Sequence, residues 1–371
     1  MQFLLPEELA QQKHEDCGRG HACEFCPLEQ DCKLDKPYHN KVLIENRLQE
    51  IEQIIVVLAN KGGVGKSTVS TNLAAGLASR GFRVGVADAD IHGPNQSRFF
   101  GFTNANIRTK KSGLETLDFE AEPIEHPIKV GSLAFMLHDD TSPIVWRDAY
   151  KHDFIHHLIG SFNWESLDFL VIDMPPGTGN ELITLCDMLE GSNVSSVLVT
   201  SPQAVAQMDS LKAARFCKER GLPVIGAAIN MAGVQCPHCK EEFHLFPDAD
   251  VLQALAAFDI EKIAQIPLSP EIALASDTGA PVVTASPDSA PAKAFASMVD
   301  AVIEHGRDAF EHAVAGTLET VFAENLSDAE MNDALSQLPE NEEISAELKS
   351  LLAQESNRLN AATKIARDPN K

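Results

Sequence analysis

The sequence predicts an α/β protein whose mostly parallel sheet is flanked by helices, with a cysteine-rich N-terminal arm and a helical C-terminal tail. Three observations predict this class: short apolar runs alternate with helical stretches, a glycine-rich turn joins the first run to the first helix, and acidic residues end several runs. Strands that alternate with helices form parallel sheets covered on both faces. Because ligands bind at the carboxyl ends of such strands, we expect the functional site there.

The apolar runs give the expected elements in order. Strands are expected at 54–58, 83–87, 169–172, 197–200 and 224–229. One helix is expected from Ser67 to before Gly81, and another over 203–220, which Gly221 closes. Residues 101–161 have a weaker pattern and receive no element, while 267–291 predict an irregular exit from the sheet. We therefore expect an arm at 1–46, an α/β domain at 47–305 and an acidic helical extension at 306–371.

The composition limits the classes of function. The chain of 371 residues has 30 Lys and Arg against 54 Asp and Glu, a formal net charge of −24. Such a surface repels phosphate backbones and anionic lipid, so we expect no nucleic-acid and no membrane partner. No apolar run approaches the ~20 residues of a membrane span, and the N-terminus lacks the features of a secretory signal. We expect a cytoplasmic protein.

The turn after the first expected strand has the chemistry of a phosphate-binding loop. It reads KGGVGKST from Lys61 to Thr68, and Asn60 stands where the strict Walker A pattern has its first Gly. Backbone amides and the following helix N-terminus suit phosphate oxygens, and a tight turn alone would not need two lysines around four small residues. We expect Lys66 to reach the phosphates and Ser67 to bind Mg²⁺. The expected nucleotide-binding residues of the loop are Gly62, Gly63, Val64, Gly65, Lys66, Ser67 and Thr68.

The second lysine, Lys61, makes this loop resemble the MinD/ParA/nitrogenase iron-protein branch of P-loop NTPases. The resemblance implies that Lys61 crosses a dimer interface to the partner's nucleotide, and hence an ATP-dependent homodimer. The guanine-reading pattern Asn-Lys-x-Asp is absent from the sequence, which favours adenine.

Two further segments resemble the switches of this branch. In Asp88-Ala-Asp-Ile-His-Gly-Pro, Asp90 is implied to position the attacking water, a role that phosphoryl transfer requires. In Asp173-Met-Pro-Pro-Gly-Thr-Gly, Asp173 is implied to hold Mg²⁺ and Gly177 to offer its N–H to the γ-phosphate. A lone Asp at a strand end is also a common helix cap, but three acids at such ends favour magnesium and nucleotide.

Six of the eight cysteines form two short clusters, which indicates metal. Cys236 and Cys239 form a C-x-x-C pair, which alone is half a zinc site, a redox pair or a coincidence. A closed zinc or Fe–S site needs four ligands, and a two-fold dimer would supply the other two. The arm contains four thiols that suit tetrahedral Zn²⁺ and a [4Fe–4S] cluster equally well: Cys17, Cys23, Cys26 and Cys32.

Taken in order, these motifs resemble the Mrp/ApbC family over about residues 54–303. The match includes Trp146-Arg147, LDFLVIDMPPGTG from Leu167, Ser201-Pro-Gln, Asn230-Met and Ile266-Pro-Leu. Where the family usually continues with Ser and a later Pro after Gly93-Pro94, this chain has Asn-Gln-Ser-Arg at 95–98. The resemblance implies a contact of Asn230 with adenine and a [4Fe–4S] cluster bridged across a dimer by Cys236 and Cys239. The arm is similar to that of eukaryotic cytosolic scaffold members, which implies a second [4Fe–4S] cluster there.

The implied function is an ATP-binding scaffold that assembles a [4Fe–4S] cluster at a homodimer interface and transfers it to apo-proteins, with slow ATP hydrolysis. Apo Fe–S recipients and a related scaffold subunit are the implied partners. Three alternatives remain open: a ParA/MinD-like positioning ATPase with idle cysteines, which the −24 charge disfavours, a nucleotide-gated electron-transfer protein, and a zinc carrier.

Overall fold

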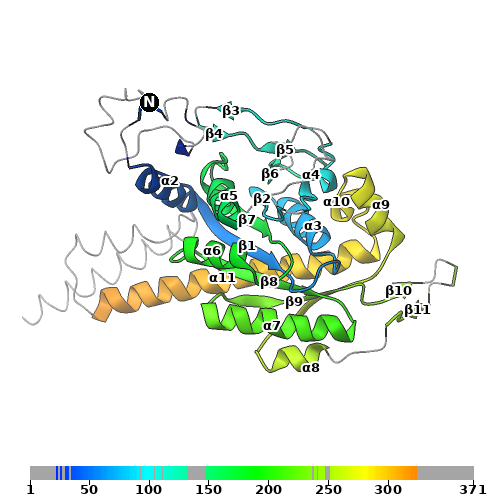
Figure 1. The fold of residues 1–371 in the computed structure, drawn as a ribbon. Coiled ribbons are helices and arrows are strands. Elements are labelled where there is room, and N and C mark those ends of the chain that lie inside the picture. The colour runs from blue at the N-terminus through cyan, green and yellow to red at the C-terminus, as the bar shows by residue number, and fades with distance from the viewer. Residues whose placement is uncertain are drawn as a thin grey trace, which may run out of the picture. The chain divides into compact units, whose positions relative to one another are not determined.

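The computed structural model describes residues 22–23, 26, 30–32, 35–91, 93–103, 105–110, 112–132, 135, 148–235, 238–239, 241–246 and 251–323. The chain divides into two units, Met1–His305 and Gly306–Lys371. The first unit is built on an eight-stranded sheet of order β12-β9-β8-β1-β7-β2-β6-β5 (Figure 1). Neighbouring strands are parallel except β5 and β6, which are antiparallel. The predicted class, a mostly parallel sheet flanked by helices, is confirmed.

The first strand lies at the centre of the sheet, paired with β7 on one side and β8 on the other. Seven of its eight residues are buried because helices cover both faces of the sheet, so the strand reads as a continuous apolar run. The strands of the sheet are β1 (Ile51–Leu58), β2 (Val84–Asp88), β5 (Leu117–Phe119), β6 (Ile128–Ser132), β7 (Leu167–Asp173), β8 (Val194–Thr200), β9 (Val224–Asn230) and β12 (Lys262–Ile266).

Two hydrophobic cores lie on the two faces of this sheet. Ile54 and Val56 of β1 belong to one core, and the alternate residues Ile55 and Val57 belong to the other, as the two-residue repeat of a strand requires. The first core contains residues of α5, α6, α7 and α8, and the second contains residues of α3 and α11. These helices are α3 (Lys66–Ala78), α5 (Asp148–Gly160), α6 (Asn180–Met188), α7 (Ala204–Arg220), α8 (Val251–Ala256) and α11 (Ala290–Ala323).

The five predicted strands are present as β1, β2, β7, β8 and β9, and the two predicted helices as α3 and α7. Gly221 ends α7 in the left-handed conformation, and its N–H donates to carbonyls of the last turn. This is the cap that glycine makes at little steric cost.

Several regions contain elements that we did not expect, among them α6, α8 and β12. Residues 101–161 contain β5, β6, α5 and a two-stranded sheet of β3 (Thr109–Lys110) and β4 (Gly113–Leu114). The stretch 267–291 contains α9 (Pro270–Thr278) and α10 (Val282–Ala285), and α4 (Gln96–Phe99) follows β2. Apart from α5, which has 13 residues, these elements are short, and short elements show little apolar periodicity.

A further unexpected helix, α2 (Lys36–Gln49), crosses the boundary that we placed at 46/47. Asp35 caps it by accepting from Tyr38 N–H at 3.2 Å. It lies against α5 (Figure 1), and the contact is close: a Cβ on Gly160 would stand 2.7 Å from Ile44 Cγ1. The last part of the predicted arm is thus a helix packed on the α/β domain.

After β9 the chain forms a hairpin of β10 (Val234–Gln235) and β11 (Glu242–Phe243), which are antiparallel. The helix α11 runs on to Ala323, and the rest of the expected helical extension, 324–371, lies outside the described residues. In the part of the chain that the structure describes, no helix has the length and apolar character needed to cross a bilayer.

Candidate functional site

The candidate site lies where the carboxyl ends of β1, β7 and β2 meet. The register pairs Val57 of β1 with Asp173 of β7, and Asp173 with Asp88 of β2. The loop that carries the expected phosphate-binding residues follows β1 directly and ends at α3 (Figure 1). The fold therefore brings together three segments far apart in the sequence, as parallel sheets do at this edge.

The loop itself needs glycine at two positions. Gly63 and Gly65 have φ angles of +79° and +84°, the region that side chains disfavour. A Cβ on Gly65 would also stand 2.1 Å from Asn230 Nδ2. Asn230 ends β9, is buried, and donates from Nδ2 to the Val64 carbonyl at 2.8 Å. The amide therefore braces the loop, while the expected contact of Asn230 with adenine stays a prediction.

Lys66, the first residue of α3, forms a buried ion pair with Asp173. Its Nζ lies 2.5 Å from Asp173 Oδ1, and both side chains are almost fully removed from solvent. Ser70 Oγ donates to the same carboxylate oxygen at 3.1 Å. The lysine expected to bind phosphate and the carboxylate expected to bind Mg²⁺ thus contact each other directly, and the Ser67 backbone lies one residue away.

Gln96, the first residue of α4, is a site residue that the sequence reasoning missed. It is fully buried, and its Nε2 donates to Asp173 Oδ2 at 2.9 Å and to the Ser67 carbonyl at 3.1 Å. Its Oε1 accepts from Thr71 Oγ1 at 2.8 Å. Its partners lie 25 to 77 residues away in sequence, so no local pattern marks it. The only available signal was the departure of 95–98 from the family pattern.

Asp88 at the end of β2 is fully buried near Asp173. Its Oδ2 accepts from Gln96 N–H and from Ser132 Oγ, both at 3.1 Å. Burial, followed by the charge of Asp173, raises the pKa of Asp88 to about 8, against the opposing effects of the Gln96 N–H and of Lys66. This carboxyl therefore holds its proton near neutral pH.

Asp90 lies two residues further on and is half-buried. Its Oδ1 accepts from Gly93 N–H at 3.3 Å, which closes the turn after β2. The structure thus places Asp90 in the segment that follows the buried Asp88, and its expected role towards the attacking water stays a prediction.

Lys61 and Gly177 are both engaged within the site. Lys61 Nζ donates to Gln203 Oε1 at 2.9 Å, just before α7. Gly177 N–H donates to the Ala59 carbonyl at 2.9 Å, so the γ-phosphate contact expected of it requires this hydrogen bond to break. Two large apolar side chains follow Gln203 on α7 and are mostly exposed, Val205 at 64% and Met208 at 62%.

In the sequence, the C-x-x-C pair stands between β10 and β11, the two strands of the hairpin that follows β9; Figure 1 shows these two strands. Cys236 lies outside the described residues. Cys239 is exposed, and its Sγ lies 4.0 Å from Glu241 Oε2. The hairpin begins only four residues after Asn230, so the cysteine pair is connected closely along the chain to the residue that braces the phosphate loop.

The arm reaches the domain at Cys23, while Cys17 lies outside the described residues. Cys23 is buried, its N–H donates to Asn40 Oδ1 at 3.0 Å, and its Sγ lies 3.2 Å from His39 Nδ1. The sequence reasoning missed His39. Cys26 and Cys32 are half-buried. Among the described residues, no three His, Cys, Asp or Glu side chains are grouped in a way that would hold a metal ion.

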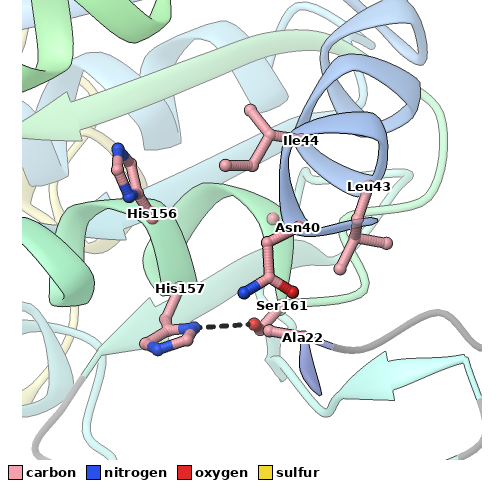
Figure 2. Close-up of a pocket in the computed structure, with 8 residues that line it drawn as sticks. Ala22, Asn40, Leu43, Ile44, His156, His157 and Ser161 are labelled. Carbon is pink, nitrogen blue, oxygen red and sulfur yellow. Dashed lines mark hydrogen bonds between the residues drawn. The ribbon is translucent and has the colours of Figure 1, made fainter. Parts of the chain in front are cut away.

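A small cavity of about 50 Å³ marks the seam between the arm, α2 and α5 (Figure 2). His156 and His157 of α5 line it opposite Asn40 and Ile44 of α2, and His157 Nδ1 lies 3.2 Å from Ser161 Oγ. A cavity of this volume has room for a few water molecules and is too small for a nucleotide.

The comparisons with known proteins agree with this geometry. The family model described as ParA: NUBPL iron-transfer P-loop NTPase matches residues 50–303. An iron-sulfur cluster carrier protein from Aquifex aeolicus is 38% identical over 249 residues, which cover 67% of this chain and 66% of that protein. The cytosolic Fe-S cluster assembly factor NBP35 of Eremothecium gossypii is 34% identical over 303 residues, which cover 80% of this chain and 90% of that protein.

A solved structure adds support for the fold and the loop. It is the nucleotide-binding protein of Archaeoglobus fulgidus in complex with ADP, with a TM-score of 0.56 and 32% identity. The similarity covers 64% of this chain and 91% of that one. Because the family model spans more than half of the sequence and includes every strand of the sheet, this chain belongs to the NUBPL iron-transfer P-loop NTPases of the ParA group.

Proposed function

We propose that the protein is an ATP-dependent iron–sulfur cluster carrier that assembles a [4Fe–4S] cluster between two copies of the chain and transfers it to apo-proteins. The observation that carries the proposal is the short connection between the two sites. Asn230 holds the phosphate loop at Val64, and the hairpin with Cys239 begins four residues later. The names of the relatives, iron-sulfur cluster carrier and Fe-S cluster assembly factor, support the same cargo.

The nucleotide part of the proposal rests on the loop and the two acidic strand ends. The backbone amides of the loop, from Gly62 to Thr68, bind the phosphates, together with Lys66 after it has left Asp173. Ser67 and Asp173 are the oxygen donors for Mg²⁺, which neutralises charge on the β- and γ-phosphates when bound. Asp90 positions the attacking water. The donor set is the one that this cation prefers, and slow hydrolysis makes the nucleotide a switch.

The number of thiolate ligands that a [4Fe–4S] cluster needs is the reason for proposing a homodimer. Cys236 and Cys239 supply two thiolates, and a [4Fe–4S] cluster needs four. A second copy related by a two-fold axis supplies the other two. Lys61 reaches the partner's nucleotide in this arrangement, and the exposed Val205 and Met208 near its contact Gln203 offer apolar surface for the interface.

The arm is proposed to hold a second metal group on Cys17, Cys23, Cys26 and Cys32. A [4Fe–4S] cluster is the proposed occupant and Zn²⁺ the alternative, since four thiolates suit both. Cys23, Cys26 and Cys32 would have to come together from the positions described, because Cys23 lies against His39. We place the protein in the cytoplasm, where free thiols persist, with apo Fe–S proteins and a related scaffold subunit as its partners.

ATP and cargo are coupled in this account. When the loop closes on nucleotide, the hydrogen bond from Asn230 to Val64 carries the change to the end of β9 and to the hairpin beyond it. Nucleotide state then alters the geometry of the two thiolates, which is a coupling free energy between two sites.

The test is iron and sulfide analysis of protein reconstituted and purified without oxygen. We expect the Cys239→Ala variant to lose the iron and sulfide held by the shared cluster and to keep those of the arm. The Cys186→Ala variant, which removes a half-buried thiol of α6 outside both motifs, is the matched control and should keep all of it. Equal iron in wild type and Cys239→Ala would contradict the proposal.

A further inference from the structure

We propose that Gln96 is a positioning residue that holds Asp173 in place for Mg²⁺ after Lys66 has turned to the nucleotide phosphates. The inference rests on the nucleotide binding proposed above and goes beyond it, because no motif of the sequence assigns a role to Gln96.

Both N–H donors and the oxygen of the Gln96 carboxamide have hydrogen-bond partners, and only one orientation of the amide satisfies them. It has two N–H donors and one oxygen acceptor. One donor goes to Asp173 Oδ2 and one to the Ser67 carbonyl, while the oxygen accepts from Thr71 Oγ1. The reversed amide would set its oxygen against two other acceptor oxygens. The network therefore fixes the amide, and the fixed amide fixes Asp173.

Asp173 needs such a partner because its environment excludes water. The side chain has no exposed surface, and its Oδ1 has the Lys66 ammonium and Ser70 Oγ as donors. When Lys66 leaves for the phosphates, Oδ1 keeps a neutral hydroxyl only. Oδ2 keeps the Gln96 donor at 2.9 Å, so one carboxylate oxygen remains oriented while Oδ1 is released for a cation. A buried carboxylate with few donors would otherwise lose much of its stabilisation.

Gln96 also connects this carboxylate to the segment after β2. Its backbone N–H donates to Asp88 Oδ2 at 3.1 Å, and Thr71 ties its side chain to α3. A change in the conformation of residues 88–95 would therefore move Gln96 and, through it, Asp173. A helix start that only packed would not need a side-chain amide that donates to Asp173 Oδ2; an apolar side chain of equal size would fill the same space.

The experiment measures how Mg²⁺ changes nucleotide affinity in the full-length protein. The probe is a fluorescent N-methylanthraniloyl ADP, titrated first with EDTA and then with increasing Mg²⁺. The Gln96→Leu variant keeps the volume and removes both donors. Ser97→Ala, the next residue of α4 and equally buried, is the matched control. Thr71→Val removes the hydroxyl that orients the Gln96 oxygen and leaves every direct partner of Asp173 in place, so it provides a second, milder variant.

We expect Gln96→Leu to need about tenfold more Mg²⁺ for half of the Mg²⁺-dependent gain in affinity, as loss of one hydrogen bond to a charged group implies. Its affinity in EDTA should fall by a smaller factor than the Mg²⁺ midpoint shifts, because Gln96 also donates to the Ser67 carbonyl. Thr71→Val should shift the Mg²⁺ midpoint in the same direction by less, and Ser97→Ala should leave it unchanged. If the Mg²⁺ midpoint is unchanged in both Gln96→Leu and Thr71→Val, the role of Gln96 is wrong while the proposed nucleotide site stands. The same holds if Gln96→Leu loses nucleotide affinity equally with and without Mg²⁺. A wild-type protein that gains no affinity from Mg²⁺ overturns the proposed nucleotide site as well.

Discussion

Among the residues that the structure describes, Asp88 is one whose ionisation differs clearly between the folded and the unfolded chain. Burial and the neighbouring Asp173 raise its pKa to about 8 from the ordinary 3.8. Between about 4 and 8 the folded protein therefore holds one proton more than the unfolded chain at this position. The stability that this protonation contributes is complete below pH 4 and is lost as the pH rises through 8.

This predicts the pH dependence of an Asp88→Asn variant, which cannot titrate. The wild-type free energy of unfolding, relative to the variant, should fall by about 1.4 kcal/mol per pH unit between about pH 5.5 and 7.5. The measurement is urea unfolding in EDTA without nucleotide. The variant also has a constant offset, because its amide donor faces Asp90 N–H where Asp88 Oδ1 accepts at 3.3 Å. Parallel pH profiles would show that Asp88 is already ionised in the fold.

The helix α2 shows how the arm is attached to the domain. Asp35 caps the start of the helix, and Leu43 is buried. The next residue, Ile44, packs closely against Gly160 of α5. Cys23 of the arm is held at the start of the same helix by Asn40 and His39. The position of the arm therefore depends on the contact between α2 and α5.

A methyl group at this contact tests that dependence. Gly160→Ala places a Cβ 2.7 Å from Ile44 Cγ1, so α2 must shift, and such overpacking costs about 1–3 kcal/mol. We expect faster hydrogen exchange in residues 36–49 and unchanged nucleotide affinity, because the phosphate loop lies elsewhere. Ile44→Ala removes the clashing carbon, so the double variant should be more stable than the sum of the two single effects. Additive effects would mean that the two residues do not press on each other.

The strands and helices differ in how well the sequence predicts them. The central strands were predictable because parallel strands covered on both faces are apolar throughout, as in β1. The edge strand β5 was not, since Asp118 is exposed between two half-buried residues. The helix α2 was missed because its composition is mostly polar, and only a few apolar residues mark its packed side.

The residues of the candidate site also fall into a predicted group and an unpredicted group. Lys66 and Asp173 were predicted because each belongs to a motif with a fixed position at a strand end. Gln96 and His39 were not, because their roles arise from contacts made only in the folded chain. Motifs identify the groups that perform the chemistry, whereas the groups that hold them in place come from long-range packing.

In the whole molecule as we propose it, each chain carries one nucleotide loop and each pair of chains shares one cluster. Cys239 is exposed on a hairpin, so its loss should leave the fold intact and remove only the ligand. A mass measurement then separates a shared cluster from one held within a single chain.

The most direct measurement is anaerobic sedimentation velocity of reconstituted protein, recorded at an absorbance of the cluster. To exclude absorbance from the arm, the background carries Cys23→Ala and Cys26→Ala. We predict that the cluster absorbance sediments with a dimer, and that adding Cys239→Ala removes both the absorbance and the dimer formed without ATP. Cluster absorbance that sediments with a single chain, or a dimer whose absorbance survives Cys239→Ala, would contradict the claim that two chains share the cluster.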